Sequence, residues 1–239
     1  MSDDRFYFRQ LLAGRDFAQD NLLARQMVNF VYLIGDREKG EAVAVDPAYG
    51  VREILEILDA DGMRLTGALA THYHADHCGG DIMGHSIEGL AELLAIDGVQ
   101  APVHVQSAEA EWVKRSTGLS DGDLVLHESG DVVYVGDIPI TLMHTPGHTP
   151  GSQCFHVGGC LVAGDTLFLE GCGRTDLPGS NPDEMYYSLT QRLATVSDDT
   201  ILFPGHLYSA DPSATMGDTR SRNFVFRMGG IDQWRAFMG

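Results

Sequence analysis

Short apolar stretches alternate with amphipathic stretches along most of the chain. Residues 27–36 and 42–47 are apolar and rich in β-branched side chains, which predicts two buried strands. Residues 51–62 place apolar side chains at helical spacing and end at Gly62, so we expect a helix there. A further apolar strand over residues 65–71 completes a strand–helix–strand unit.

The same reading of apolar spacing predicts the elements of the rest of the chain. We expect helices over residues 86–96, 107–116 (with Ser107 as N-cap) and 181–195. We expect strands over residues 101–105, 152–157, 160–165 and 200–206, and a hairpin turning at Gly136-Asp137 over residues 132–145. The first thirty residues are irregular in pattern, and residues 117–131 are acidic and turn-rich, so no regular element is expected there. The alternation of strands and helices predicts an α/β fold.

Charge and cysteine content narrow the classes of partner and compartment. The 239 residues carry a formal net charge of −18 and a pI near 4.7, which disfavours nucleic acid and anionic membranes as partners because both would be repelled. The polar N-terminus resembles no signal peptide. The four cysteines are scattered without a C-x-x-C pair, which favours the cytoplasm: Cys78, Cys154, Cys160 and Cys172.

Polar motifs rich in metal-ligating residues directly follow four of the expected strands. They are THYHADH, HTPGHTPGS, AGDTLF and FPGHLYS, and their ligand-type residues span 135 positions, from 72 to 206. Strand ends line up along one edge of a sheet, where open α/β folds place their sites. We therefore expect the four motifs to meet in space.

The first motif has the composition of a metal site. His72, His74, Asp76 and His77 fall within six residues, and imidazoles with carboxylates suit Zn²⁺, Fe²⁺ or Mn²⁺. These four side chains are too close in sequence to serve a single tetrahedral ion unaided, whereas two neighbouring ions would use them economically. Asp165 is a candidate bridging carboxylate between ions about 3.5–4 Å apart. Asp76 is a candidate for orienting or deprotonating a water molecule.

Other residues near the motifs are open to two interpretations. Asp46 either orients a ligand or is a turn residue before Pro47. Gly147 and Gly205 each precede a histidine, and either bring its ring close to an ion or simply form turns. Five histidines lack a ligand context and are expected to be structural: His85, His104, His127, His144 and His156. His144 comes nearest to the pattern, four residues before His148, but it lies inside an expected strand.

With these motifs in view, the chain resembles the metallo-β-lactamase superfamily, on its glyoxalase II side. The pattern T-H-x-H-x-D-H occupies residues 71–77, followed by Gly147-His148-Thr149, Gly164-Asp165 and Pro204-Gly205-His206. The resemblance implies a four-layer αβ/βα sandwich, with the site at the edge between its two sheets. We expect one such domain over residues 1–239, with its core at about 27–210.

The resemblance also implies a ligand set and a reaction. One metal would be held by His72, His74 and His148, and a second by Asp76, His77 and His206, with Asp165 bridging. Zinc is the expected metal, with iron or manganese as alternatives. The reaction implied is hydrolysis of a thioester, ester or lactam by a metal-bridging hydroxide, with Asp76 as catalytic residue and a homodimer as a candidate assembly.

A second segment keeps an alternative open. GCGRTD, residues 171–176, resembles the corresponding segment of persulfide dioxygenases, in which His72, His148 and Asp165 would hold a single Fe²⁺ that acts on glutathione persulfide. A third alternative is a metal-binding or redox-sensing protein without turnover. The helical domain that holds glutathione in glyoxalase II would be mostly missing, because 33 residues follow His206.

The expected substrate is a small molecule, with a glutathione-type thiol conjugate as the candidate. Arg174 is a candidate anion binder or a partner in an ion pair that stabilises the fold, and Arg222 is a second candidate cation. Tyr208, by resemblance, would contact a thiol substrate or simply pack. The long stretch at about 81–105 is expected to shape the substrate mouth.

Overall fold

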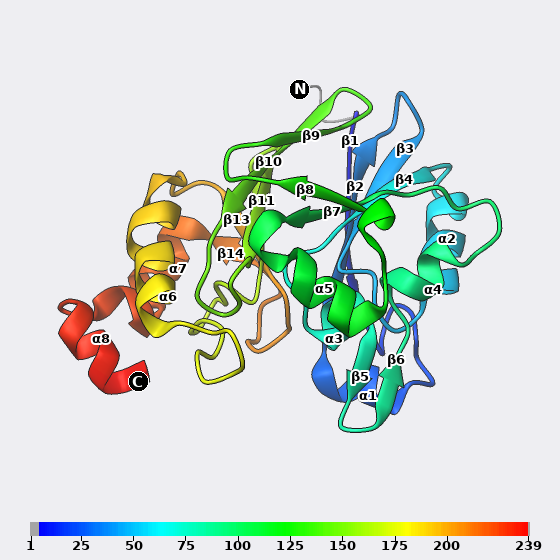
Figure 1. Ribbon diagram of the computed structural model, residues 1–239. Coiled ribbons are helices and arrows are strands. Elements are labelled where there is room, and N and C mark those ends of the chain that lie inside the picture. Colours follow the sequence, from blue (N-terminus) through cyan, green and yellow to red (C-terminus); the bar gives the residue numbers. More distant parts are fainter. Residues whose placement is uncertain (1–4, 239) are drawn as a thin grey trace.

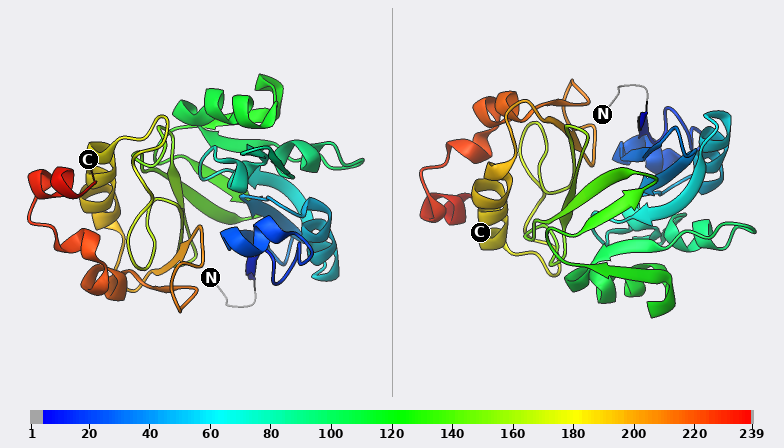
Figure 2. Two further views of the ribbon diagram at one scale, coloured as in Figure 1. Left: turned by 90° about the horizontal axis from the view of Figure 1, so that it is seen from below. Right: turned by 90° about the horizontal axis from the view of Figure 1, so that it is seen from above.

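Two six-stranded sheets stack face to face in the computed structural model, which describes residues 5–238. Helices cover the outer face of each sheet, so the order of layers is helix, sheet, sheet, helix (Figure 1). The two further views in Figure 2 show the same order, with α6 to α8 on one flank and α2, α4 and α5 on the other. The four-layer αβ/βα arrangement expected from the resemblance is confirmed.

The first sheet has the strand order β1-β2-β3-β4-β7-β8. Strands β1 to β3 are antiparallel neighbours, whereas β3, β4, β7 and β8 run parallel. The parallel strands are joined through helices, as crossover connections require. The strands span Phe6–Leu12, Phe30–Asp36, Glu41–Val45, Arg64–Leu69, Val103–Gln106 and Leu124–His127.

The second sheet has the order β14-β13-β12-β11-β10-β9, in which only β12 and β13 are parallel. From β9 to β14 its strands span Val132–Val135, Ile138–His144, Gln153–Val157, Cys160–Gly164, Ile201–Pro204 and Ala214–Thr215. A separate two-stranded hairpin is formed by β5 (Gly80–Ile82) and β6 (His85–Ile87).

The helices are short and divide between the two outer faces. Those of the first half are α1 to α5, over Leu22–Met27, Val51–Ala60, Ala75–Cys78, Leu90–Leu94 and Ala110–Thr117. Those of the second half are α6 to α8, over Pro182–Tyr187, Met216–Arg222 and Ile231–Met238.

Three apolar clusters fill the spaces between the layers. Strand β2 shows how one strand serves two of them, because successive side chains point to opposite faces. Phe30, Tyr32 and Ile34 pack between the sheets, while Val31 and Leu33 pack under the helices of the first half. The third cluster lies between the second sheet and the C-terminal helices, with Trp234 fully buried in it.

The N-terminal segment corrects the sequence analysis. Residues 6–12 form β1, a full-length partner of β2, and α1 follows it. Polar side chains hide the strand pattern: Arg9 pairs with Asp61 and Gln10 donates to the Tyr32 hydroxyl. These polar side chains form hydrogen bonds with residues of neighbouring elements, and the spacing of residues in the sequence does not indicate such bonds.

Four other expectations need correction. The helix expected over residues 86–96 is strand β6 followed by the shorter α4. The segment 117–131, expected to be irregular, contains strand β8. The helix expected from Ser107 begins with a 3-10 turn over Ser107–Glu109, capped by the side chain of Gln106. The helix expected over residues 181–195 changes to a π-helical turn at Ser188–Arg192 and a 3-10 turn at Leu193–Thr195.

The other strands and helices that the sequence predicted lie within a few residues of their expected ends. The elements α3, β5, β14, α7 and α8 were not predicted. Within residues 5–238, none of the helices has the length and apolar character to span a bilayer. One domain over residues 1–239 stays a prediction, and residues 1–4 and 239 of that range lie outside the described part.

Candidate metal centre

The four polar motifs meet at one edge of the two stacked sheets. The loop after β4 supplies His72, and α3 supplies Asp76 and His77. The loops after β10, β12 and β13, all in the second sheet, supply His148, Asp165 and His206. The strand-end placement therefore brings residues from both halves of the chain together, as expected.

The first group of nitrogen ligands consists of His72, His74 and His148, whose ring nitrogens lie within 4.8 Å of one another. His148 donates from Nδ1 to the carbonyl of Arg174 at 2.8 Å, so the lone pair of its Nε2 is free. That Nε2 lies 3.0 Å from Nδ1 of His74. This group matches the set that the resemblance assigned to the first metal.

The second group consists of Asp76, His77 and His206, again with ligand atoms within 4.8 Å. His77 donates from Nδ1 to Asp46 at 2.9 Å, and His206 donates from Nδ1 to the carbonyl of Met27 at 2.8 Å. These bonds leave both Nε2 atoms facing the site, only 3.2 Å apart. Two facing lone pairs are avoided either by a proton on one ring or by a metal ion that binds both nitrogens.

Asp165 lies between the two groups. Its Oδ1 is 3.4 Å from His77 Nε2, and its Oδ2 is 3.3 Å from His206 Nε2 and 3.7 Å from His148 Nε2. One carboxylate thus reaches members of both groups, which is the position that a bridging ligand requires.

Two buried side-chain atoms without hydrogen-bond partners indicate whether divalent ions fit these groups. Among the described residues, His72 Nε2 and Asp165 Oδ1 are the buried side-chain atoms without a hydrogen-bond partner. Leaving buried acceptors unpaired costs about 1–3 kcal/mol each. Both atoms belong to the candidate ligand set, and a cation would satisfy both, so the donor set fits divalent metal ions.

The protonation states suit metal binding. Burial, with the nearby His77, lowers the pKa of His72 far below its ordinary value, and burial with the adjacent His148 lowers the pKa of His74 to about 4. Both rings are therefore neutral near pH 7, as ligands must be. Burial opposes protonation of His77, but Asp76 and Asp165 outweigh it and raise its pKa to about 10. These carboxylates thus favour a positive charge at this place, carried either by a proton on His77 or by a metal ion that displaces that proton.

The contacts of Asp46 favour the first of its two interpretations, in which its carboxylate orients a candidate ligand. It accepts from His77 Nδ1 and from the hydroxyl and backbone N–H of Thr71, at 2.6–2.9 Å. Its backbone adopts φ 52°, the left-handed region that Asp tolerates better than most residues. Such an arrangement fixes the ring of a metal-ligating histidine.

Two further buried polar residues escaped the sequence analysis. Asn29 donates to Asp76 Oδ2 at 3.1 Å and accepts from the Tyr49 hydroxyl at 3.0 Å. Glu109, 1% exposed, accepts from Tyr73 N–H, the Thr149 hydroxyl and Gly151 N–H. A polar residue within the apolar run 27–36 was a signal for Asn29, whereas Glu109 stands in an ordinary helical pattern that carries no such signal.

Position 205 requires a glycine because neighbouring atoms lie too close to leave room for a Cβ, and not because of its backbone angles. A Cβ at this position would lie 2.3 Å from Asp165 Oδ1 and 3.0 Å from the His77 ring. Gly147 differs, because it has φ 140° and its α-carbon packs against the backbone of Met185. Both glycines thus let a ligand histidine sit close to its neighbours.

A cleft of about 1020 Å³ opens onto the two groups of ligands. Tyr208 lines it, with its ring stacked on that of His206 at 4.6 Å between centroids. Arg174 lines it too, but its guanidinium is bound by both oxygens of Asp176 at 2.7 Å. Arg222 lines a separate small cavity. Residues 81–83 and His85, of the β5–β6 hairpin, line the cleft, so this part of the long stretch shapes the mouth as expected.

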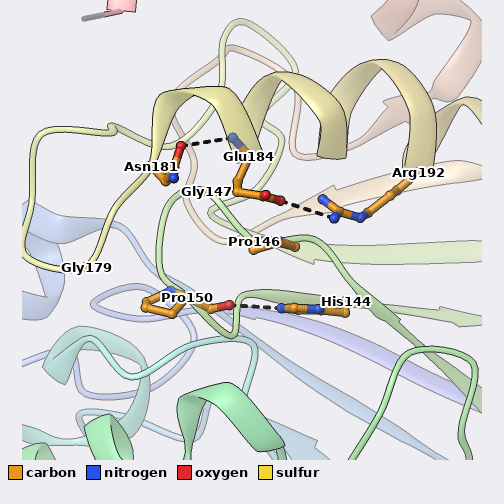
Figure 3. Close-up of a pocket in the computed structure, with 8 residues that line it drawn as sticks. All are labelled: His144, Pro146, Gly147, Pro150, Gly179, Asn181, Glu184 and Arg192. Atoms are coloured by element: carbon orange, nitrogen blue, oxygen red, sulfur yellow. Dashed lines mark hydrogen bonds and ion pairs between the residues drawn. The ribbon is translucent and has the colours of Figure 1, made fainter.

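The other histidines lie outside both groups. His144 donates from Nε2 to the carbonyl of Pro150 at 2.9 Å, inside a second cavity of about 390 Å³ (Figure 3). The same cavity contains the ion pair of Glu184 with Arg192. His104 and His127 contact each other at 2.8 Å on β7 and β8.

Comparison with known families decides the relationship. The family model of the metallo-beta-lactamase superfamily matches residues 25–206, a range that contains every candidate ligand. The chain belongs to the metallo-beta-lactamase superfamily. Members of this superfamily are metal-dependent enzymes, so the family and fold predicted from the motifs are confirmed.

Similar proteins divide among several activities. A probable polyketide biosynthesis zinc-dependent hydrolase of Bacillus velezensis is 30% identical, over 84% of this chain and 82% of its own length. The human mitochondrial persulfide dioxygenase ETHE1 is 29% identical, over 90% of this chain and 80% of its own. A hydroxyacylglutathione hydrolase of Tolumonas auensis is 34% identical, over 76% of this chain but only 62% of its own length.

A solved structure supports the fold. The crystal structure of ETHE1 from Myxococcus xanthus has a TM-score of 0.77 and 28% identity, covering 97% of this chain and 89% of its own. Its similarity extends over nearly all of the four layers described above.

Proposed function

We propose that the protein is a metal-dependent hydrolase that cleaves a thioester or a related acyl substrate. The observation that carries this proposal is the pair of adjacent ligand groups with Asp165 between them. Three histidines near one position and two histidines with an aspartate near the other suit zinc better than a hard, oxygen-preferring ion. Iron and manganese are the alternatives.

The proposed roles follow the geometry. His72, His74 and His148 would hold one ion and Asp76, His77 and His206 the other, with Asp165 shared. Divalent ions held here would supply Lewis acidity and lower the pKa of a water molecule.

The residues of the chain would orient the reactants. Asn29 fixes Oδ2 of Asp76, which leaves Oδ1 of Asp76 to accept a proton from the attacking water. Tyr208, exposed in the cleft beside His206, is a candidate to contact the leaving group.

A persulfide dioxygenase is the second candidate. The chain spans 80% of the human persulfide dioxygenase but 62% of the hydroxyacylglutathione hydrolase named above. His72, His148 and Asp165 would then hold a single Fe²⁺, in the two-histidine, one-carboxylate arrangement of iron oxygenases.

Metal content and gas exchange distinguish the two candidates. Protein purified without chelators should contain about two metal ions per chain, mostly zinc, and should release thiol from thioesters without consuming oxygen. About one iron per chain, with oxygen uptake on glutathione persulfide at an enzymatic rate, would establish the dioxygenase instead.

A histidine substitution tests the candidate site itself. His148→Ala should remove metal from the first group and lower kcat/KM more than the roughly 10–100-fold cost of losing an outer partner of a ligand. His144→Ala is the matched control, four residues away and bonded to Pro150 rather than facing the site. Full metal content and full activity in His148→Ala would contradict the ligand assignment.

A further inference from the structure

The cleft that opens onto the candidate metal centre has mainly apolar walls. Helix α1 and the β5–β6 hairpin form one side, and the loop between β12 and α6 forms the other. The larger aliphatic and phenyl side chains that line it are Leu23, Met27, Ile82, Met83, Phe168 and Leu177. Its volume of about 1020 Å³ accommodates a substrate well beyond the size of a short hydroxyacyl group.

The charged groups of the walls are mainly acidic. Asp81 and Glu170 line the cleft, and neither takes part in an ion pair among residues 5–238. Arg174 is the single Lys or Arg residue among the lining side chains. Both oxygens of Asp176 bind its guanidinium, through Nε and Nη2 at 2.7 Å each, so an entering anion would compete with Asp176 for it.

These walls would repel an anionic substrate. Along the walls, away from the metal ions that the ligand groups at the floor would hold, a carboxylate would lose hydration against apolar side chains, and Arg174, which is already paired, is the single Lys or Arg side chain that it would meet. It would also approach Asp81 and Glu170, and like charges placed close together disfavour the wrong ligand. The formal charge of −18 on the chain adds long-range repulsion.

We propose that the substrate carries no anionic group near its reacting carbonyl and that both of its arms are neutral or cationic and mainly apolar. The proposal rests on the hydrolase function proposed above and names its substrate class. Thiol conjugates that keep free carboxylates, such as those of glutathione, would be poor substrates. Asp81 and Glu170 would be the residues that exclude them.

A matched pair of ligands tests the charge requirement directly. S-hexylglutathione has two free carboxylates, and its diethyl ester has the same skeleton with both carboxylates masked. Neither thioether can be hydrolysed at sulfur, so binding to the metal-loaded protein is measured by calorimetry without turnover. We expect the diethyl ester to bind at least about tenfold more tightly, and the gap to narrow as salt screens the charges.

Two variants localise the effect. Asp81→Asn combined with Glu170→Gln should reduce the affinity ratio of diester to free acid at least about threefold. Glu56→Gln combined with Asp59→Asn, on the exposed face of α2, removes the same charge elsewhere and should leave the ratio unchanged. An unchanged ratio in the cleft variant, or equal binding of both thioethers to the wild type, would overturn the proposal.

Turnover measurements distinguish a failure of the proposed substrate class from a failure of the proposed hydrolase function. Hexanoyl thioesters of glutathione and of its diethyl ester are compared by thiol release under the same conditions. Faster release from the diester supports both proposals, and faster release from the free acid refutes the substrate class alone. No release from either thioester refutes the hydrolase function, while the thioether measurement still decides the charge requirement.

Discussion

At the scale of single residues, one buried carboxylate, Glu109, contacts both loops that carry the first ligand group. Three histidines and an aspartate in six residues have few explanations other than a metal, so His72 to His77 stood out in the sequence. Glu109 and Glu111 look alike in the same helical pattern. Only the approach of two loops makes Glu109 buried while Glu111 stays exposed.

Glu109 ties the two loops that carry the first ligand group, so its removal should loosen that group. Oε1 accepts from Tyr73 N–H and the Thr149 hydroxyl, at 2.8 and 2.6 Å, and Oε2 accepts from Gly151 N–H at 2.6 Å. Glu109→Gln would place an amide donor against one of these donors. We expect metal affinity at the first group to fall about 10–100-fold, measured by competition with a chromophoric chelator.

The control for this change is Glu111→Gln, which lies two residues along and pairs only with Lys114 at the surface. Glu111→Gln should bind metal with the same affinity as the wild type. A uniform weakening of both ligand groups in Glu109→Gln would point to general destabilisation rather than to positioning of one group.

At the scale of elements, the apolar packing extends beyond residue 206, where the match to the family model ends. Residues beyond 210 form α7 and α8, which pack on the second sheet and bury Met216, Val225 and Trp234. Between these helices, Asn223 donates from Nδ2 to the carbonyls of Phe168 and Gly171, at 2.9 and 2.8 Å. The C-terminal elements therefore hold one wall of the cleft, a contact that the spacing of apolar residues could not indicate.

Asn223→Ala should loosen the segment 168–171, which forms part of the cleft wall. The Phe168 carbonyl loses this donor and the Gly171 carbonyl keeps only the backbone N–H of Phe168, at a cost of about 1–3 kcal/mol in the free energy of unfolding. Because Phe168 lines the cleft, we expect KM for a thioester to rise by more than kcat falls. Steady-state kinetics and thermal unfolding measure the two effects.

Asn181→Ala supplies a control of similar energetic cost. Asn181 caps α6 by accepting from the N–H groups of Asp183 and Glu184, and losing such a cap costs about 1 kcal/mol. Asn181→Ala should lower the free energy of unfolding and leave KM unchanged. Equal KM values in Asn223→Ala and the wild type would show that the wall does not depend on this residue.

At the scale of the whole molecule, one buried carboxylate joins the ends of the two sheets. Asp36, at the end of β2, is fully buried and receives both Nε and Nη2 of Arg5, at 3.0 and 2.6 Å. It also accepts from the backbone N–H of Asp137 in the β9–β10 turn at 2.9 Å. The alternation of strands and helices predicted an α/β fold, and the resemblance carried by the ligand motifs implied its four layers, whereas this cross-sheet link depends on residues 101 positions apart.

Removing that charge should make stability less sensitive to acid. The hydrogen bonds from Arg5 outweigh burial and hold the pKa of Asp36 well below its usual value of about 3.9. The contribution of the carboxylate is therefore fully present above about pH 4 and is lost as the pH falls toward the lower folded pKa. Asp36→Asn should lower Tm by several degrees at pH 7, and the difference should shrink below about pH 4.

Thermal unfolding between pH 7 and pH 3 measures this difference. Asp232→Asn is the control, because Asp232 is 98% exposed at its side chain and makes a single ion pair at 3.7 Å. A Tm difference for Asp36→Asn that stayed constant across this range would contradict the assignment.

The division of ligands between the two sheets sets an order of events during synthesis. His72, His74, Asp76 and His77 leave the ribosome first, and the chain must grow by more than a hundred further residues before His206 joins them. A growing chain thus displays half of a metal site for several seconds, at ordinary translation rates of about 5–20 residues per second. During that interval any ion is held by an incomplete set of ligands, so tight and selective loading is a late step of maturation that follows docking of the second sheet.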